Sequence, residues 1–336
     1  MPPAPAKPKV SLIMRAVEMG GIQTGIGALT HSRLAEKFEF AVATPDEAGR
    51  QLRSGGPRIF MFKEPCSWRG VPTLAAFRLR KGRSKIVIHE HHYSEHFVRC
   101  TVPSPARFHA MLRLSYAMAD RVLAISHGQA DWMLAHRLVP PSRLALVVQA
   151  SPLSPLLALP PRPPARPLVL GALGRFHRQK GFDVLIEAMR LLPRGKARLL
   201  LAGGGPDEAM LRALGAGLDD VTFTGPRTDI AGFFAECDAV VIPSRWEPFG
   251  RVCQEAKAAG KPVIVSGVDG LSEQVDGCGL LVAPEDPAAL AAAIAQLCES
   301  PDETLHAWGA RGRETVADAV EDYLRGMDQL LTELTP

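Results

Sequence analysis

Two glutamates lie in the segment whose residue types and spacing best suit chemistry. Glu247 and Glu255 are separated by seven residues, the first in a loop with Pro, Phe and Gly and the second in a helix pattern. Apolar runs at 239–242 and 262–265 precede and follow them, so the segment predicts strand, loop, helix, strand. Ligands of open α/β sheets collect where strands end and helices begin. We place Glu255 about two turns into the helix, where its carboxylate can face the same cleft as the loop.

Two cations flank a second loop that is suited to chemistry. Arg175 and Lys180 follow the apolar run 168–173, with Gly174 before them and a helix pattern after Gly181. Two cations together with the free N–H groups of a helix N-terminus suit a diphosphate. When a sugar–phosphate bond breaks, the leaving diphosphate gains charge, and preorganised cations stabilise that charge in the transition state. No Asp-x-Asp metal-binding pair is present in the sequence.

Histidines follow the apolar run 85–89 in the first half of the chain. A continuing strand would turn Glu90 and His91 to opposite sides, and the His-Glu-x-x-His spacing of zinc enzymes is absent. A metal site and purely structural histidines are both open readings. His91 is the first candidate for a functional side chain, and His89 is the second.

Glycines follow the first apolar run, 10–14. Gly20 and Gly21 would let the backbone approach bound phosphates closely. A competing pattern, Gly25-x-Gly27, resembles part of a dinucleotide fingerprint, but it lacks the third glycine and begins too far from the strand. We therefore favour Gly20 and Gly21 as the ligand-binding glycines.

The segments around the glutamates and the two cations resemble the retaining glycosyltransferases of family 4. The resemblance is carried by Glu247-Pro-Phe-Gly, four residues, then Glu-Ala-x-Ala-x-Gly-x-Pro-Val-Ile, and by Gly-Arg-x-x-x-x-Lys-Gly at 174–181. It is specific over about 171–282 and only architectural elsewhere. It implies the α/β GT-B fold, in which two Rossmann-like, doubly wound parallel-sheet domains face a cleft and a C-terminal helix crosses back to the first domain.

The resemblance also implies roles for individual residues. Glu247 would contact the sugar hydroxyls, and Glu255 would accept hydrogen bonds from both ribose hydroxyls, as a carboxylate can. The base would lie near the loops 203–205 and 225–227. Catalytic roles would fall to His91, Glu247, Arg175 and Lys180. The implied donor-binding residues are Gly20, Gly21, Gly174, Arg175, Lys180, Glu247, Phe249, Gly250 and Glu255, with no metal ligand.

Alternating strand and helix patterns on both sides of a Pro-rich stretch predict two doubly wound parallel sheets. The stretch at 151–167 has too many prolines for a helix interior or a central strand, which makes it the expected boundary. The expected parts are a disordered tail at 1–9, an acceptor-side domain at 10–150, the linker at 151–167, a nucleotide-sugar-binding domain at 168–317, and a returning helix at 318–336.

Charge is distributed unevenly along an otherwise ordinary globular composition. Residues 1–150 carry 21 Lys and Arg against 10 Asp and Glu, whereas residues 151–336 carry 18 against 25. A basic first half, densest at 78–85, favours an anionic acceptor or the inner face of a membrane, although a solvated basic loop explains it equally well. The six cysteines form no Cys-x-x-Cys pair, which favours reduced thiols and a cytoplasmic location.

These observations together predict a metal-independent, retaining glycosyltransferase that needs no cofactor. Its donor would be a nucleotide-diphosphate sugar, and its acceptor a hydroxyl of a glycan, a lipid-linked molecule or a small molecule. Two alternatives share the architecture: a sugar-nucleotide epimerase, and a non-catalytic protein that binds sugar nucleotides. We find no pattern for nucleic-acid binding.

Overall fold

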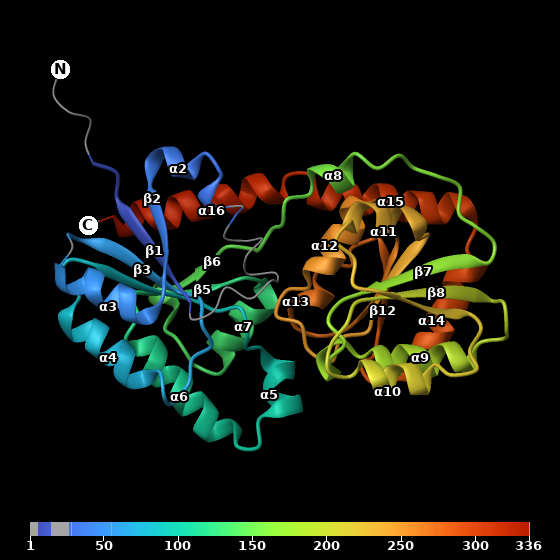
Figure 1. Cartoon of the computed structure of the whole chain (residues 1–336), viewed down its shortest axis with the longest axis horizontal. Coiled ribbons are helices and arrows are strands. Elements are labelled where there is room, and N and C mark those ends of the chain that lie inside the picture. Colours follow the sequence, from blue (N-terminus) through green and yellow to red (C-terminus); the bar gives the residue numbers. More distant parts are fainter. Residues whose placement is uncertain (1–5, 15–26, 28, 55, 336) are drawn as a thin grey trace. The chain divides into compact units, whose positions relative to one another are not determined.

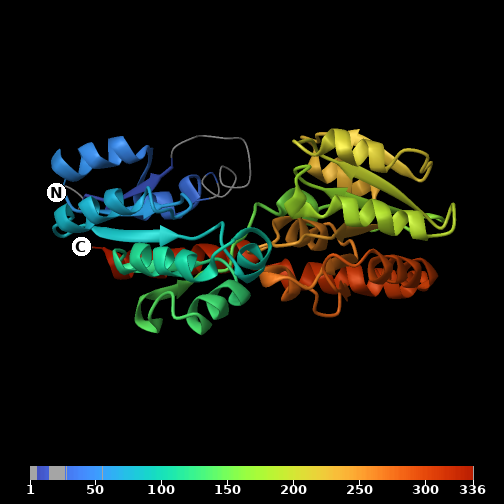
Figure 2. The same ribbon diagram turned by 90° about the horizontal axis from the view of Figure 1, so that it is seen from below.

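The computed structural model describes residues 6–14, 27, 29–54 and 56–335, which fall into two compact units (Figure 1). Unit 1 comprises Met1–Ser151 and Glu321–Pro336, and unit 2 comprises Pro152–Val320. Each unit contains a six-stranded sheet, and within the described ranges every strand pairing is parallel. Figure 2 shows helices on both sides of each sheet, as parallel sheets require because neither face can be left to water.

The sheet of unit 1 has the strand order β2-β1-β3-β4-β5-β6. Its strands are β1 (Lys9–Ile13), β2 (Glu39–Ala43), β3 (Arg58–Phe62), β4 (Lys85–His89), β5 (Arg121–Ala124) and β6 (Leu144–Leu146). The chain leaves β1 for β2 on one side and then crosses to β3 on the other. The topological switch point of unit 1 therefore lies between β1 and β3, at their carboxyl ends.

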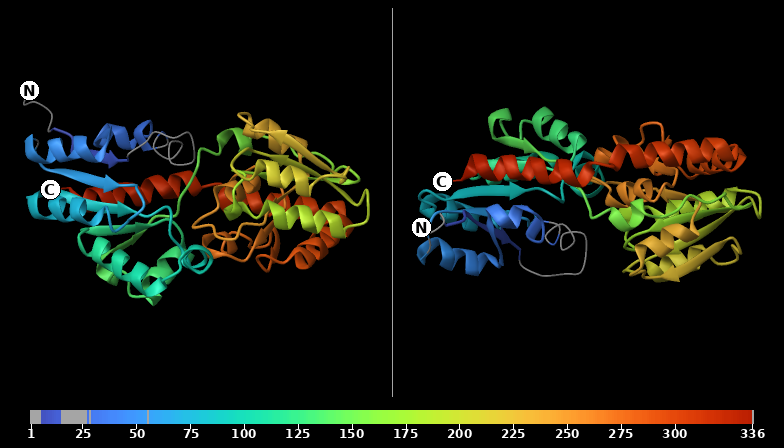
Figure 3. Two further views of the ribbon diagram at one scale, coloured as in Figure 1. Left: turned by 60° about the horizontal axis from the view of Figure 1, so that its bottom comes forward. Right: turned by 90° about the horizontal axis from the view of Figure 1, so that it is seen from above.

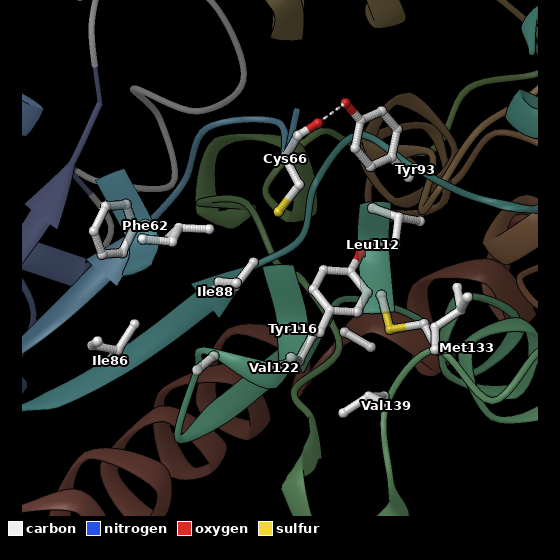
Figure 4. Close-up of a cluster of buried hydrophobic side chains, with 14 of the residues drawn as sticks. Phe62, Cys66, Ile86, Ile88, Tyr93, Leu112, Tyr116, Val122, Met133 and Val139 are labelled. Carbon is white, nitrogen blue, oxygen red and sulfur yellow. Dashed lines mark hydrogen bonds between the residues drawn. The ribbon is translucent and has the colours of Figure 1, made fainter. Parts of the chain in front are cut away.

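Helices of unit 1 connect these strands. They are α2 (Leu34–Lys37), α3 (Pro45–Ser54), α4 (Val71–Arg80), α5 (Glu95–Thr101), α6 (Pro105–Ala117), α7 (His127–Ala135) and the 3-10 turn η1 (Pro141–Arg143). Ser126 caps α7, because its side chain accepts a hydrogen bond from the N–H of Gln129. Tyr116 of α6 is fully buried in the core that Figure 4 shows, where the hydroxyl of Tyr93 also donates to the carbonyl of Cys66 over 2.6 Å.

The last helix, α16 (Ala319–Leu334), belongs to unit 1 from Glu321 onward and lies beside its sheet (Figure 3). Its buried residues follow a helical stripe: Tyr323, Met327, Leu330, Leu331 and Leu334. Ion pairs join Glu321 to Arg33 at 2.5 Å and Asp328 to Lys37 at 2.5 Å, but both pairs are partly exposed. Exposed pairs contribute at most about 1 kcal/mol each. The apolar stripe is therefore the main attachment, and the expected return of the C-terminal helix to the first domain is confirmed.

The sheet of unit 2 has the strand order β12-β11-β10-β7-β8-β9. Its strands are β7 (Leu168–Leu173), β8 (Ala197–Ala202), β9 (Val221–Gly225), β10 (Ala239–Ile242), β11 (Val263–Ser266) and β12 (Gly279–Val282). The chain runs from β7 outward to β9 and then returns to β10 on the other side of β7. The switch point of unit 2 therefore lies between β7 and β10.

Two cores cover the two faces of this sheet. The helices are α8 (Ser154–Leu157), η2 (Arg178–Lys180), α9 (Phe182–Leu191), α10 (Glu208–Leu214), α11 (Ile230–Glu236), α12 (Arg251–Ala258), α13 (Asp269–Ser272), α14 (Pro287–Glu299) and α15 (Asp302–Val316). Helices α9 and α14 supply Leu185 and Ile294 to one core. Helices α11 and α12 supply Phe233 and Ala256 to the other. The doubly wound architecture expected for the second half is thus present.

The Pro-rich stretch departs in one respect from the expected linker. It contains the one-turn helix α8, which begins just after Leu153. Pro155 lies in the first turn, where a missing N–H breaks no helical hydrogen bond. Leu153 and Leu156 are buried in the core of unit 2.

Within the described ranges, no helix combines the length and apolar character that crossing a bilayer would need.

Candidate functional site

The carboxyl-end loops of unit 2 are held together through glycines. Gly181, between η2 and α9, has φ of 64°, and a Cβ there would lie 2.0 Å from the carbonyl oxygen of Pro243. Gly203, after β8, has φ of 145°, and a Cβ there would lie 1.9 Å from the carbonyl oxygen of Gly174. No larger residue fits either contact without moving backbone. The loops that follow β7, β8 and β10 therefore form one continuous edge.

Lys180 and Glu247 meet at the switch point of this sheet. The ammonium of Lys180 forms an ion pair with Oε2 of Glu247, which also accepts a hydrogen bond from the hydroxyl of Ser244 at 3.3 Å. The backbone N–H of Glu247 donates to the carboxylate of Asp269 at 3.0 Å. We predicted separate partners for the two side chains, phosphate for the lysine and sugar for the glutamate. In the structure the two side chains form an ion pair instead, so the ammonium of Lys180 and the carboxylate of Glu247 neutralise each other.

Arg175 is an exposed cation of the same loop. Among the residues that the structure describes, its guanidinium has neither an ion-pair nor a hydrogen-bond partner. The neighbouring His177 uses Nδ1 to accept from the N–H of Gln179 at 3.2 Å, which shapes η2. Burial, and then the charge of Arg175, lower the pKa of His177. Arg175 is therefore available to an anion that approaches this edge.

The loop before α12 is tightly built around Phe249 and Gly250. Gly250 has φ of 93°, and a Cβ there would lie 2.7 Å from Cδ1 of Leu271. The side-chain amide of Gln274 donates to the carbonyl oxygens of both Phe249 and Gly250. The carbonyls of both residues are therefore engaged within the loop, Phe249 itself is buried, and their binding of the donor stays a prediction.

Glu255 lies a little more than one turn into α12, and our expectation of about two turns was wrong. The helix begins at Arg251, directly after the predicted loop, so Glu255 is its fifth residue. The carboxylate of Glu255 is mostly buried and lies 3.4 Å from the guanidinium of Arg251. The first turn of an α-helix carries N–H groups without intrahelical acceptors, so negative charge is favoured beside it.

The two loops assigned to the base lie against the cationic loop. The N–H of Phe176 donates to the carbonyl of Gly204 at 2.8 Å, and the N–H of Gly203 donates to the carbonyl of Gly225 at 2.9 Å. Gly205 is also close, because a Cβ there would lie 2.5 Å from the carbonyl oxygen of Phe176. The loops therefore share one edge with Arg175, and base binding there stays a prediction.

Arg245, which directly precedes the Trp-Glu pair, was missed by the sequence reasoning. Its guanidinium binds both carboxylate oxygens of Asp183 at 2.8 and 2.6 Å and one oxygen of Glu285 at 2.6 Å. Hydrogen bonding to Asp183 raises the pKa of Arg245. These contacts connect the loop after β10 to the start of α9, and they therefore help to fix the positions of Glu247 and Lys180.

In unit 1, a buried lysine joins the histidine group, and the sequence carried no signal for it. The ammonium nitrogen of Lys63, just after β3, lies 3.1 Å from Nδ1 of His89 and 3.5 Å from Nε2 of His91. The two imidazole rings are 3.9 Å apart between centroids. Burial lowers the pKa of Lys63 to about 7 and that of His89 well below its ordinary value. His91 thus belongs to a cluster of three basic groups at the carboxyl edge of the sheet.

Glu90 stabilises the fold of this loop. Its carboxylate accepts hydrogen bonds from the N–H groups of His92 and Tyr93, at 2.8 and 3.2 Å, and from the hydroxyl of Tyr116 at 2.9 Å. In the described part of the chain, no three His, Cys, Asp or Glu side chains are grouped so as to hold a metal ion. Gly20 and Gly21, the remaining predicted donor-binding residues, lie outside the described residues.

Comparisons with known proteins find similar glycosyltransferases. Residues 167–300 match a family model described as glycosyl transferases group 1. The chain is 37% identical over 179 residues to the lipopolysaccharide core biosynthesis glycosyltransferase LpsD of Rhizobium meliloti (strain 1021), covering 51% of this chain and 52% of that protein. It is 33% identical over 234 residues to a D-inositol 3-phosphate glycosyltransferase of Arthrobacter sp. (strain FB24), covering 63% and 55% respectively. The matches thus span about half the length of these relatives.

Solved structures resemble nearly the whole chain. Sucrose-phosphate synthase from Thermosynechococcus elongatus superposes with a TM-score of 0.80 at 22% identity, covering 98% of this chain and 99% of that one. Anabaena Alr3699/HepE in complex with UDP superposes with a TM-score of 0.78 at 18% identity, covering 97% and 100%. At such identities the likeness shows the fold alone. The chain thus has the GT-B fold of these structures, and its residues 167–300 are similar to the group 1 glycosyl transferases.

Proposed function

We propose that the protein transfers a sugar from a nucleotide-diphosphate sugar to a hydroxyl acceptor, with retention of anomeric configuration and without a metal ion. The observation that carries this proposal is the ion pair of Lys180 and Glu247, which joins the loop of Arg175 to the loop after β10. Lys180, which would bind the leaving diphosphate, and Glu247, which would bind sugar hydroxyls, meet at the switch point between β7 and β10. Ligands of open α/β sheets bind at such points.

The donor diphosphate would replace Glu247 as the partner of Lys180. Arg175 and Lys180 would then neutralise the charge that develops as the bond between the sugar's C1 and the phosphate oxygen breaks. The acceptor oxygen forms the new bond to C1 on the same face, and its proton leaves with the diphosphate or to water. Released from its ion pair, Glu247 would accept hydrogen bonds from the hydroxyls of the transferred sugar.

The nucleotide part of the donor would bind along α12. Glu255 lies near the helix N-terminus, and a carboxylate there suits the two vicinal ribose hydroxyls. The related fold of Anabaena HepE has been solved in complex with UDP-glucose, which supports a nucleotide sugar as the ligand class. On the acceptor side, Lys63 and His91 provide basic groups, and we infer that His91 faces the reacting sugar.

A paired substitution tests the proposal. In the variant with Arg175→Ala and Lys180→Ala, sugar transfer should fall by about a hundredfold or more, because both charges opposite the leaving group are lost. Arg178→Ala is the matched control, since it removes an exposed cation from the same loop. Retained transfer in the double variant would contradict the phosphate assignment. Proton NMR of the first-formed product gives the anomeric configuration, and transfer should persist in excess chelator.

We also propose that the acceptor side contacts an anionic membrane surface. Leu79 at the end of α4 is 86% exposed, and Arg80 and Arg83 beside it are exposed as well. Part of the basic stretch is already neutralised, because Asp120 binds both Arg78 and Lys81. Binding to anionic vesicles should be measurable at low salt, and it should fall with rising salt and in Leu79→Ser. Absence of vesicle binding at low salt would remove this idea.

A further inference from the structure

A pocket of about 550 Å³ lies within unit 2 at the amino ends of β10 and β11, away from the loops of the proposed donor site. Its walls come from the Pro-rich stretch, from the turn between α12 and β11, and from one face of α15. The residues that line it are Pro160, Pro161, Arg162, Pro163, Pro164, Asp238, Ala259, Gly260, Lys261, Pro262, Leu305, His306, Gly309, Ala310 and Arg313. A volume of this size suits a small metabolite.

The end of α12 places Lys261 in this pocket. Gly260 has φ of 69°, its N–H donates to the carbonyl of Lys257, and the N–H of Lys261 donates to the carbonyl of Ala256. This is the Schellman arrangement, which turns the chain sharply after a helix. Helix α15 then approaches closely, because a Cβ on Gly309 would lie 2.3 Å from the carbonyl oxygen of Gly260. Backbone geometry, rather than a flexible surface chain, therefore sets the position of the lysine.

Lys261 is a buried cation without a counter-charge in contact. The residue is only 7% exposed, and its ammonium has no hydrogen-bond or ion-pair partner among the described residues. Burial, and then the charge of Arg162, lower the pKa of Lys261. Because most of the residue is removed from water, an anionic ligand would compensate the partly desolvated ammonium.

The other charges around the pocket leave it strongly positive. The guanidinium of Arg313 donates to the carbonyl of Leu159 at 2.5 Å, while its buried Nε has no partner in the described chain. Asp238 is the one carboxylate of the lining, and it is paired with Arg162 at 2.8 Å and accepts a hydrogen bond from the N–H of Val169 at 2.8 Å. Three cations therefore face a single neutralised carboxylate.

We propose that this cationic pocket binds a phosphorylated small molecule, at a site separate from the donor loops. The excess of two positive charges matches a phosphate monoester dianion. Lys261 and Arg313 would bind the phosphate through charge-assisted hydrogen bonds, which are roughly twice as strong as neutral ones. The prolines of the Pro-rich stretch, together with Leu305, form an apolar wall for the organic part.

Isothermal titration of the full-length protein with phenyl phosphate tests the proposal. UDP is kept saturating so that phosphate does not report on the donor loops. Phenyl phosphate should bind at one site and more tightly than inorganic phosphate, because its ring can cover the proline wall. Lys261→Gln should weaken binding by about tenfold or more, as expected for loss of a buried charge-assisted hydrogen bond. Lys196→Gln, which removes a lysine paired with Glu299 on the surface, should leave binding unchanged.

A second pair of variants keeps every cation and blocks the pocket instead. Ala310 is an exposed residue of the lining on α15, so Ala310→Phe should close the pocket while Ala310→Ser leaves it open. Phenyl phosphate should fail to bind Ala310→Phe and should bind Ala310→Ser as it binds the wild type. Absence of binding to the wild type, or equal binding to Ala310→Phe, would overturn the proposal. UDP titrations of the same proteins report on the proposed donor site separately, so the two ideas can fail independently.

Discussion

Replacing Glu247 with glutamine should tighten the binding of a nucleoside diphosphate and at the same time slow sugar transfer. In the structure, Glu247 occupies the ammonium of Lys180, the group that we assign to the donor phosphates. A diphosphate must displace this carboxylate before it can use the lysine. Glutamine is nearly isosteric and removes the competing charge, so Lys180 becomes available. The sugar, in contrast, loses the carboxylate that we assign to its hydroxyls.

The size of the effect follows from the burial of the pair. The side chains of Lys180 and Glu247 are 19% and 11% exposed, so solvent screens the pair only partly. Two unit charges 4 Å apart attract by about 4 kcal/mol at the effective dielectric constant of a protein surface, before desolvation is subtracted. Net values for hydrogen bonds to charged groups are about 1.5–3 kcal/mol. Because neutral glutamine retains part of this interaction, we expect UDP to bind about threefold to tenfold more tightly, and transfer to fall by about a hundredfold.

Calorimetric titration with UDP and a transfer assay under single-turnover conditions measure the two effects. The decisive control is Glu247→Gln in a Lys180→Ala background, in which no tightening should remain, because the lysine that it would release is absent. Unchanged or weaker UDP binding in Glu247→Gln with Lys180 intact would refute the competition between carboxylate and phosphate. Equal tightening in both backgrounds would also refute it, since it would show only a general loss of negative charge.

Three further predictions follow from single contacts. Glu255→Ala should weaken UDP binding by about tenfold and leave the rate from the bound state nearly unchanged, because a ribose contact is made equally before and during transfer; a fall in that rate with binding intact would contradict this role. Gly203→Ala should lower the free energy of unfolding in urea by about 2 kcal/mol or more, since the new Cβ would lie 1.9 Å from a carbonyl oxygen at φ of 145°; a change within about 0.5 kcal/mol would show that the loops relax easily. Burial lowers the pKa of Lys63 to about 7 in the folded state. Between pH 7 and about 10, the folded state therefore binds fewer protons than the unfolded state, in which the lysine is still charged. The free energy of unfolding of the wild type, relative to that of Lys63→Met, should therefore rise with pH across this window by a few kcal/mol at most. If this difference does not change with pH, the lysine is charged in the folded state and a neighbouring group stabilises its charge.

Most of the secondary structure was predictable because it depends on local patterns. The strands at Lys85–His89, Leu168–Leu173 and Ala239–Ile242 have the predicted bounds, since each is a short, largely apolar run. Helices that are very short or have few apolar residues were missed. Helix α3 (Pro45–Ser54) is strongly polar, and α13 (Asp269–Ser272) is only four residues long. Helix α8 was excluded by its proline, although a first-turn proline is compatible with a helix.

The residues of the candidate site also differ in whether the local sequence could predict them. Arg175, Lys180, Glu247 and Glu255 could be found from the sequence because their neighbours, glycines and prolines at set spacings, are close in the chain. The depth of Glu255 in its helix was wrong although the helix start was right, because the fifth residue of a helix lies only a little more than one turn from its start. Arg245 and Lys63 were missed because their partners are distant in the sequence, so a single basic residue gives no local sign of its contacts.

The sequence by itself determined which segments become parallel strands and which loops carry cations, carboxylates and glycines, because these properties depend on residues within one or two turns of each other. Only the tertiary structure decided which of those groups meet. Lys180 and Glu247 are 67 residues apart, and they pair because β7 and β10 are neighbours in the sheet. The three cations of the cationic pocket come from three separate segments in the same way. Strand order sets such contacts, and it results from packing over the whole unit rather than from any local run of residues.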